Sequence, residues 1–170
     1  MGYVHNTSFS QSIPPTVMYG TVAAWAIAAG TVTNTIVYGA DATDEVAVLT
    51  VPIPIPSNSV ANVGAYLKSV EIDFEILTAA CDAVSAVIRK LTRGGDGSVP
   101  VMSAPSVSYD TGHDSAAERI TVDQHQMTVS LDTPEWIDND ETFVLEVSFD
   151  KATTTTVEIL HAIANYTLRA

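Results

Sequence analysis

Three carboxylates at alternate positions are the residues of this sequence best placed for chemistry. Glu71, Asp73 and Glu75 alternate with apolar residues, so on a strand they would share one face at spacings of about 6.5–7 Å. That spacing resembles the carboxyl separation of an inverting glycosidase. A solvated strand face is the simpler interpretation, because no neighbouring residues predict an apolar pocket that would keep one carboxyl protonated. The sequence also lacks a nucleophile elbow, a phosphate loop and a dinucleotide-binding turn. We therefore assign no catalytic residue and expect no enzymatic activity.

A polar turn offers clustered oxygens, the ligands that calcium prefers. Asp138, Asp140 and Glu141 fall in this turn, but it lacks the glycine and terminal Glu of an EF-hand loop. The four histidines have no zinc-site spacing. His125 and His161 occur on otherwise apolar strand faces, which favours hydrogen-bonded buried or interfacial histidines over metal ligands. We expect no cofactor or metal, with calcium at this turn as the alternative.

Aromatic residues give another binding alternative. Trp25, Trp136 and Tyr109 could form a sugar-stacking platform, with Trp136 as the stacking residue of a carbohydrate-binding β-sandwich module. A tryptophan in a turn more often caps the end of a sandwich core. Both interpretations of Trp136 remain open at this stage.

The composition indicates a surface that contacts other protein. Only 7 residues are Lys or Arg against 20 Asp and Glu, giving a net charge of −13, while 46% of residues are hydrophobic. Charged residues make up 16%, below the roughly 25% typical of soluble domains. The charge argues against nucleic-acid binding. No segment is apolar enough to span a membrane, and the first residues do not resemble a signal peptide.

The periodicity of the apolar residues is that of strands. Alternation with period two predicts strands over residues 21–27, 31–38, 45–55, 69–76, 83–91, 126–131, 143–150 and 157–168. Residues 22–29 could instead form a short alanine-rich helix. We expect 126–131 and 143–150 to be antiparallel neighbours. The last strand is apolar on both faces, which indicates a strand covered on both sides or one with a bulge. Together these predict one all-β domain, an antiparallel, jelly-roll-like β-sandwich over residues 19–170.

Three further segments are predicted to contact other subunits. Residues 1–18 lack any period and predict an extended N-terminal arm. Deleting residues 1–16 should leave the sandwich folded but weaken assembly. Alternating prolines over residues 51–56 predict an edge strand or extended crossing segment. Residues 94–124 predict a large loop. The expected interface residues are Tyr3, Val4, Phe9, Ile13, Ile53, Ile55, Val99, Val101, Met102 and Tyr109.

Residues 66–168 resemble the jelly-roll structural proteins of bacteriophages and environmental viruses. The resemblance lies in the segments LKSVEIDF at 67–74, HQMTVSL at 125–131, FVLEV at 143–147 and YTL at 166–168. It implies a virion component: a capsid decoration protein, a small capsid jelly roll, or a tail or fibre piece, on the outer capsid or tail surface. The implied partners are further copies of the chain, a trimer being one arrangement, and other virion proteins. A non-viral surface-layer or filament subunit remains an alternative.

Overall fold

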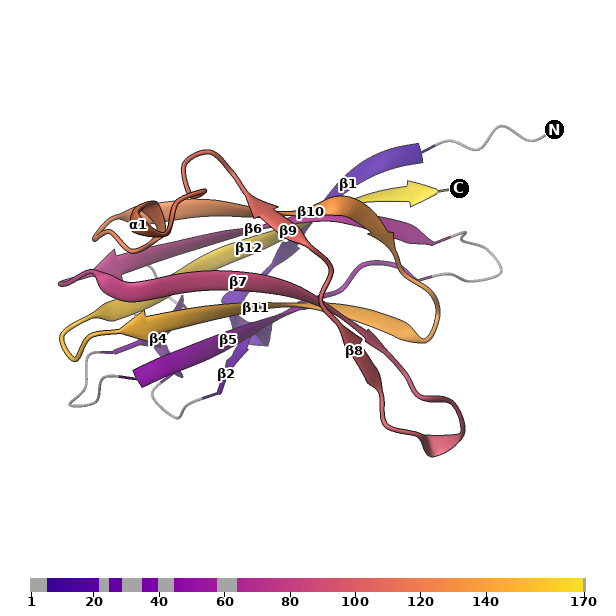
Figure 1. Ribbon diagram of the computed structural model, residues 1–170, viewed down its shortest axis with the longest axis horizontal. Coiled ribbons are helices and arrows are strands. Elements are labelled where there is room, and N and C mark those ends of the chain that lie inside the picture. Colours follow the sequence, from indigo (N-terminus) through magenta and orange to yellow (C-terminus); the bar gives the residue numbers. More distant parts are fainter. Residues whose placement is uncertain (1–5, 22–24, 29–34, 40–44, 58–63, 170) are drawn as a thin grey trace.

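Two antiparallel sheets make up the protein. The structure, a computed structural model, describes residues 6–21, 25–28, 35–39, 45–57 and 64–169. The long strands run along the long axis of the molecule (Figure 1). The predicted all-β antiparallel sandwich is therefore confirmed. Within the described residues, no helix has the length and apolar character needed to cross a membrane.

The larger sheet has seven strands in the order β3-β4-β12-β6-β10-β9, with β1 pairing β12 beside β4. We call it the seven-stranded sheet. Its strands are β1 (Asn6–Ile13), β3 (Trp25–Ala28), β4 (Thr35–Tyr38), β6 (Ala65–Leu77), β9 (Val107–Tyr109), β10 (Gln124–Trp136) and β12 (Thr156–Arg169).

The smaller sheet has five strands in the order β2-β5-β11-β7-β8. We call it the five-stranded sheet. Its strands are β2 (Tyr19–Gly20), β5 (Glu45–Ile53), β7 (Cys81–Thr92), β8 (Val101–Ser103) and β11 (Glu141–Lys151). In the connections that the structure describes lie three short helices: η1 (Pro15–Val17), η2 (Gly95–Gly97) and α1 (Ala116–Arg119).

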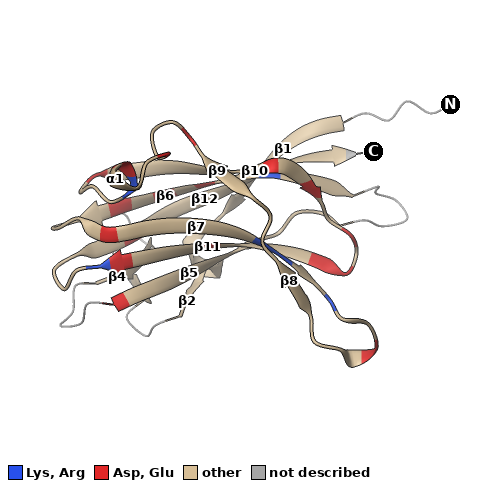
Figure 2. Ribbon diagram, in the orientation of Figure 1, with Lys and Arg blue, Asp and Glu red and all other residues tan. Residues whose placement is uncertain are grey.

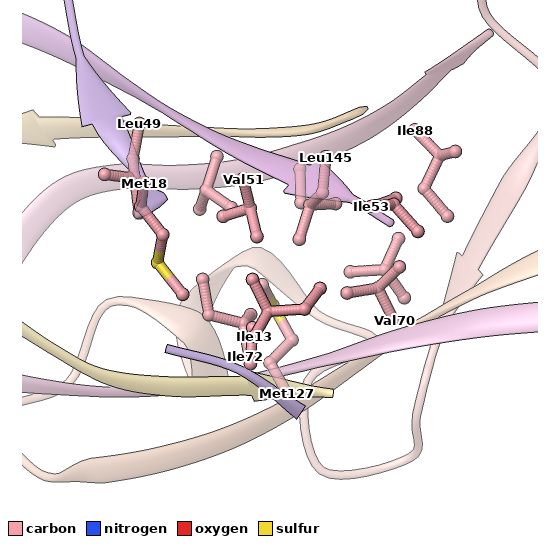
Figure 3. Close-up of a cluster of buried hydrophobic side chains, with 14 of the residues drawn as sticks. Ile13, Met18, Leu49, Val51, Ile53, Val70, Ile72, Ile88, Met127 and Leu145 are labelled. Atoms are coloured by element: carbon pink, nitrogen blue, oxygen red, sulfur yellow. The ribbon is translucent and has the colours of Figure 1, made fainter. Parts of the chain in front are cut away.

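The core forms where the apolar faces of the two sheets meet, as the period-two alternation predicts. In β6, Ile72 and Phe74 are fully buried, and in β11 so are Leu145 and Val147. Figure 3 shows Ile72 of one sheet opposite Leu145 of the other within this cluster. The polar positions between them, such as Asp73, are half-buried on the outer face.

The last strand, β12, has neighbouring strands on both edges and also contains bulges. β12 has sheet neighbours on both edges, and its register with β6 shifts after Ile159 and again after Asn165. Each shift is a bulge that changes which side chains face inward. The bulges explain why apolar residues occur on both faces of this segment.

The prediction that residues 126–131 and 143–150 are neighbours is wrong. β10 pairs with β6 and β9 in one sheet, whereas β11 pairs with β5 and β7 in the other. Residues 137–140 cross between the sheets, and Ile137 is buried at the crossing. Alternation shows that each segment is a strand but does not show which sheet it joins.

The N-terminal segment is a strand rather than an arm outside the sheets. β1 pairs with β12 from Asn6↔Arg169 to Ile13↔Ala162, and Ile13 is fully buried. Ser10 and Ser12 alternate with the inward residues, a pattern too polar to suggest a strand. Deleting residues 1–16 would therefore remove a strand and a core side chain. Tyr3 and Val4 lie outside the described residues.

The proline segment completes β5. Pro52 pairs with Val144 of β11 and lies beyond the two residues of β5 that β2 pairs. Its missing N–H therefore falls where, among the described residues, no strand borders the outer edge of β5. Ile53 and Ile55 are buried at 4% and 8% exposure. Their side chains belong to the protein's own core, so the prediction that they are interface residues is wrong.

Candidate functional site

A projecting hairpin at one edge of the five-stranded sheet carries the most exposed apolar side chains. β7 and β8 pair over Lys90↔Ser103 to Thr92↔Val101, and their connection extends away from the two sheets (Figure 1). Asp96 and Gly97 adopt positive φ angles of 54° and 76°, which allows the chain to turn at the tip. The turn is closed by the Ser98 amide, which donates to the Gly95 carbonyl at 3.0 Å.

The apolar side chains on this hairpin form what we call the hairpin patch. Val99, Val101 and Met102 are 84%, 66% and 54% exposed. Residues 97–109 contain no charged residue, and Figure 2 shows the ribbon of β8 free of charged positions, although the connection carries some. These three predicted interface residues are therefore on the surface and available for contact.

The neighbouring edge of the sheet, in contrast, is covered by the chain itself. β8 pairs only with the end of β7, and residues 109–120 cover the rest of that strand. The Tyr109 hydroxyl donates to the Ala86 carbonyl at 3.0 Å and accepts from the Ala86 amide at 2.9 Å. Arg119 Nε donates to the Val84 carbonyl at 2.9 Å, and the Cys81 amide donates to the Ile120 carbonyl at 3.1 Å. Tyr109, expected at an interface, instead joins the two sheets within one chain.

Arg119 holds the covering segment together. The side chain is 9% exposed and donates from Nη1 to the carbonyls of His113 and Asp114. Its guanidinium carbon lies 4.3 Å from the centre of the Tyr109 ring, a cation–π contact. Backbone carbonyls and an aromatic face thus satisfy this buried cation.

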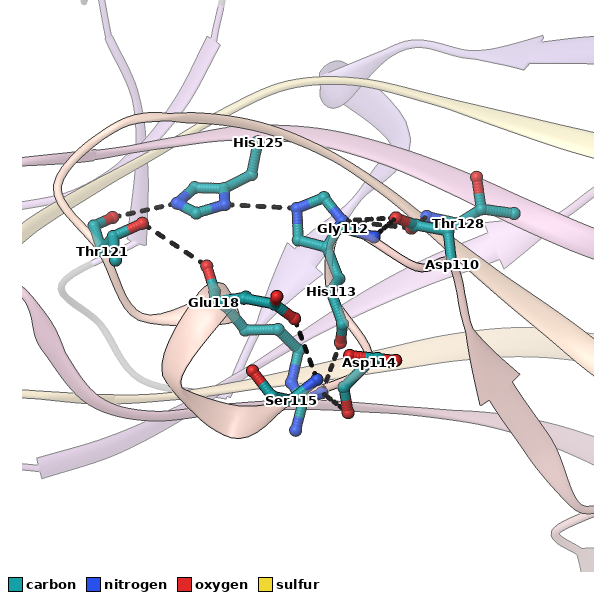
Figure 4. Close-up of polar contacts among 10 residues, drawn as sticks. Asp110, Gly112, His113, Asp114, Ser115, Glu118, Thr121, His125 and Thr128 are labelled. Atoms are coloured by element: carbon teal, nitrogen blue, oxygen red, sulfur yellow. Dashed lines mark hydrogen bonds and ion pairs between the residues drawn. The ribbon is translucent and has the colours of Figure 1, made fainter.

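A chain of polar contacts runs through the same segment (Figure 4). His113 Nδ1 lies 2.9 Å from Asp110 Oδ1, and His113 Nε2 lies 3.3 Å from His125 Nδ1. His125 Nε2 donates to the Thr121 carbonyl at 2.9 Å. The predicted hydrogen-bonded, buried state of His125 is confirmed.

The acceptor at one end of this chain fixes the direction of one hydrogen bond. A backbone carbonyl only accepts, so His125 Nε2 is the donor to Thr121. At the other end, the Asp110 carboxylate faces His113 Nδ1.

Asp110 is organised as an acceptor. Burial alone would raise the pKa of Asp110, but hydrogen bonds from the Thr128 amide, the His113 ring and the Gly112 amide together lower it below its ordinary value. The Thr128 amide lies 2.7 Å from Oδ2 and the Gly112 amide 3.0 Å from Oδ1. The carboxylate therefore ties the covering segment to β10.

The outer face of the seven-stranded sheet carries a second set of polar groups. Register places Ser108, Ser130, Ser69, Asn165 and Ser10 in one row across five strands. Asn165 Oδ1 accepts from Ser10 Oγ at 2.6 Å, and Asn165 Nδ2 donates to Glu71 Oε1 at 2.6 Å. We call this row, together with Glu71, the polar row.

Aromatic rings and a hollow flank the polar row. Tyr66 and Trp136 are register partners whose rings meet edge to face with centroids 5.0 Å apart. Further along β6, Asp73 lines a hollow of about 420 Å³ with residues that include Gln124 and Gln126. Asp73 Oδ1 is buried and has no hydrogen-bond partner. The predicted platform of Trp25, Trp136 and Tyr109 does not form, because these residues lie in three different surroundings.

The remaining predicted interface and calcium residues make contacts within the protein itself. Phe9 is 41% exposed and stacks on Tyr166 with centroids 5.7 Å apart, whereas Ile13 is a core residue, contrary to its predicted interface role. At the proposed calcium turn, Glu141 accepts from the Asp138 amide at 2.8 Å and lies 2.9 Å from Lys90 Nζ.

Those contacts make Glu141 a cap of the turn. Over the described ranges, no group of three or more His, Cys, Asp and Glu side chains, Asp140 included, is placed to hold a metal ion.

The Asp110–His113–His125 cluster is the arrangement that the sequence did not predict. Its members lie within 16 residues, but they meet because Asp110 follows β9 and His125 is the second residue of β10, which pairs with β9. The spacing fits neither a metal site nor a triad. The polar residues that precede the apolar alternation of β10 were the signal in the sequence that could have indicated this cluster.

Comparison with known proteins gives likenesses of fold. No family model and no curated protein matches the chain. A solved structure from a study of carbohydrate-binding modules of the beta-sandwich super family matches with a TM-score of 0.40 and 11% identity, over 92% of this chain and 54% of that one, so the chain spans about half its length. TmCBM61 in complex with beta-1,4-galactotriose matches with a TM-score of 0.37 and 9% identity, over 96% and 88%. The enzymatically active domain of bacteriophage CBA120 tailspike protein 4 matches with a TM-score of 0.36 and 6% identity, over 92% and 19%. At these scores the likenesses transfer no function to this chain.

Proposed function

We propose that this chain is a structural β-sandwich subunit that assembles with other protein subunits through the hairpin patch. The observation that carries the proposal is the exposure of Val101 and Met102 on the edge strand β8 and of Val99 in the connection just before it. Following the resemblance of residues 66–168, the assembly we propose is a virion, with this chain on its outer capsid or tail surface.

Edge strands explain why this exposure matters. A bare apolar edge strand invites pairing with another chain, and monomeric proteins cover or charge such edges. This protein covers β7 with Tyr109 and Arg119, yet in the described part of the chain β8 ends the sheet with no strand beyond it. The chain thus covers the edge of β7 and leaves the edge of β8 exposed, which supports a role for β8 in subunit contact.

The energy available is moderate. The exposed fractions of the hairpin patch equal about two complete aliphatic side chains, and burying each is worth ~1.5–3 kcal/mol. Covering the patch therefore contributes ~3–6 kcal/mol, against an association cost of ~4–15 kcal/mol. One contact would be weak, and repeated contacts around an assembly would make it stable.

Light scattering after size exclusion tests the proposal. Wild type should form oligomers as its concentration rises, and the double variant Val101→Asp, Met102→Asp should stay monomeric. Val122→Asp, at another exposed valine (52%), is the matched control and should assemble as wild type does. A wild type that remains monomeric at every concentration, or a double variant that assembles normally, would refute the role of the hairpin patch.

Carbohydrate binding is a second candidate, favoured by the outer face of the seven-stranded sheet. Tyr66 and Trp136 lie at one end, and the hollow beside Asp73 lies seven residues further along β6, roughly 23 Å at 3.3 Å per residue. Rings beside amide, hydroxyl and carboxylate groups suit sugar faces and sugar hydroxyls. The length suits an extended oligosaccharide.

A glycan array followed by calorimetry tests this candidate. Binding by wild type that is lost in Trp136→Ala, and kept in Val122→Asp, would support it. The absence of any glycan ligand, or binding unaffected by Trp136→Ala, would contradict it.

A further inference from the structure

A groove at the opposite side of the sandwich is bordered by an edge strand of each sheet. β2 ends the five-stranded sheet and β3 ends the seven-stranded sheet. Between them lies a groove of about 290 Å³ lined by residues including Tyr19, Trp25 and Ile27. Tyr19 and Ile27 are 57% and 58% exposed. None of the lining residues is charged.

Trp25 forms the wall of this groove. Its ring stacks on Tyr38 with centroids 4.9 Å apart and occupies the space that a Cβ at Gly20 would need. Trp25 Nε1 is buried without a hydrogen-bond partner, which costs a folded chain stability. Among the described residues, the groove is therefore lined by uncharged residues, with one buried N–H that has no partner.

We infer that this groove receives the hairpin patch of a second copy of the chain, so that subunits join head to tail. The inference rests on the proposed assembly function and specifies how the subunits meet. Val99, Val101 and Met102 of one copy would contact Tyr19, Trp25 and Ile27 of the next.

Charge favours a second copy at this site. Each chain carries a net charge of −13, so two copies repel wherever carboxylates face one another. Residues 97–109 have no charge, and neither do the groove's lining residues. The hairpin patch and the groove are thus surfaces where two copies can meet without opposing carboxylates.

Size permits this pairing. The groove of about 290 Å³ is many times larger than the roughly 10–15 Å³ that on the same kind of measure admits one water, so it has room for aliphatic side chains.

The two surfaces cannot meet within one chain. β2 and β8 are the opposite edges of the five-stranded sheet, separated by β5, β11 and β7, or roughly 19 Å at 4.8 Å per strand. The occupant must come from a neighbouring copy. Because the two surfaces differ, the contact is heterologous and produces a ring, or a filament if the rotation does not close.

Mixing two defective variants tests the inference. Val101→Asp, Met102→Asp removes the hairpin patch and keeps the groove, whereas Ile27→Asp blocks the groove and keeps the hairpin patch. Each should self-associate at least tenfold more weakly than wild type, and their mixture should form a one-to-one dimer that does not grow. Circular dichroism checks that each variant is folded, and Ile27→Ser is the milder groove variant if Ile27→Asp is not.

Fluorescence provides a direct reading of the groove. Trp25 and Trp136 are the two tryptophans of the chain, so in a Trp136→Phe background the emission reports Trp25 alone. Its emission should shift to the blue and its iodide quenching should fall as wild-type hairpins assemble, with no change for Val101→Asp, Met102→Asp.

Two results would overturn the inference, and they differ in meaning. If wild type assembles and Ile27→Asp or Ile27→Ser assembles equally well, the head-to-tail contact is wrong while the proposed assembly survives, for example through β8 pairing with β8. If wild type never assembles, both are wrong.

Discussion

Removing one hydroxyl should expose how the protein closes the edge of β7. In Tyr109→Phe the ring remains, while both hydrogen bonds to the Ala86 amide and carbonyl, at 2.9 and 3.0 Å, are lost. Ala86 pairs with Val147 of β11 on its other side, so its backbone groups on the Tyr109 side depend on this hydroxyl. A hydrogen bond contributes a net ~0.5–1.5 kcal/mol, so two predict a loss of ~1–3 kcal/mol and a fall in Tm of roughly 2–12 °C.

Urea unfolding at a concentration where the chain is monomeric gives the required free energy. Tyr19→Phe is the matched control, because Tyr19 is 57% exposed and the change should be nearly neutral. Hydrogen exchange of the Ala86 amide should also accelerate in Tyr109→Phe. Equal unfolding free energies for the two variants, with unchanged exchange at Ala86, would refute the role given to Tyr109.

Three further predictions concern other parts of the molecule. The pKa of Asp110 is lowered in the folded protein, so the contribution of its carboxylate to stability is present above its unfolded pKa and is lost as pH falls through the folded value. In urea unfolding, Asp110→Asn should therefore lower the free energy of unfolding clearly at pH 7 and little near pH 2. An equal loss at both pH values would contradict this. Burial, reinforced by Asp82 and Asp150 and opposed by Lys151, raises the pKa of Cys81 to about 12. The thiol should therefore resist iodoacetamide at pH 8 in the folded protein and react once the protein is unfolded. Rapid labelling of the folded protein would contradict this. Gly64 has a φ of +97°, and a Cβ there would lie 2.7 Å from the Trp136 ring, so Gly64→Ala should cost ~1–3 kcal/mol in unfolding free energy and alter Trp136 emission, whereas Gly39→Ala, with open space around it, should not.

Local alternation was sufficient for most strands and for their inward faces. Phe74 and Leu145 are buried where the period-two pattern places them, because a half-buried strand exposes alternate residues. The pattern failed for β1, whose serines and Gln11 conceal a strand that pairs with β12. It also failed for the pairing of β10 with β11, since sheet membership depends on contacts distant in sequence.

The interface predictions show a related limit. Ile53 and Ile55 were expected to anchor an apolar contact, and they do, but the contact is the chain's own core. Val99, Val101 and Met102 are exposed on the projecting hairpin, where no strand period identifies them. Hydrophobicity predicts that a side chain will be buried, and only the fold shows whether its own chain or a neighbour can cover it.

Hydrogen exchange across β8 tests the assembly account most directly. The amides of Val99, Val101, Met102 and Ser103 should exchange more slowly when wild type is concentrated enough to form oligomers than after dilution to monomer, with Val122→Asp behaving as wild type. Rapid exchange of these amides in a sample shown by light scattering to be oligomeric would contradict the account, because the subunits would then be joined elsewhere.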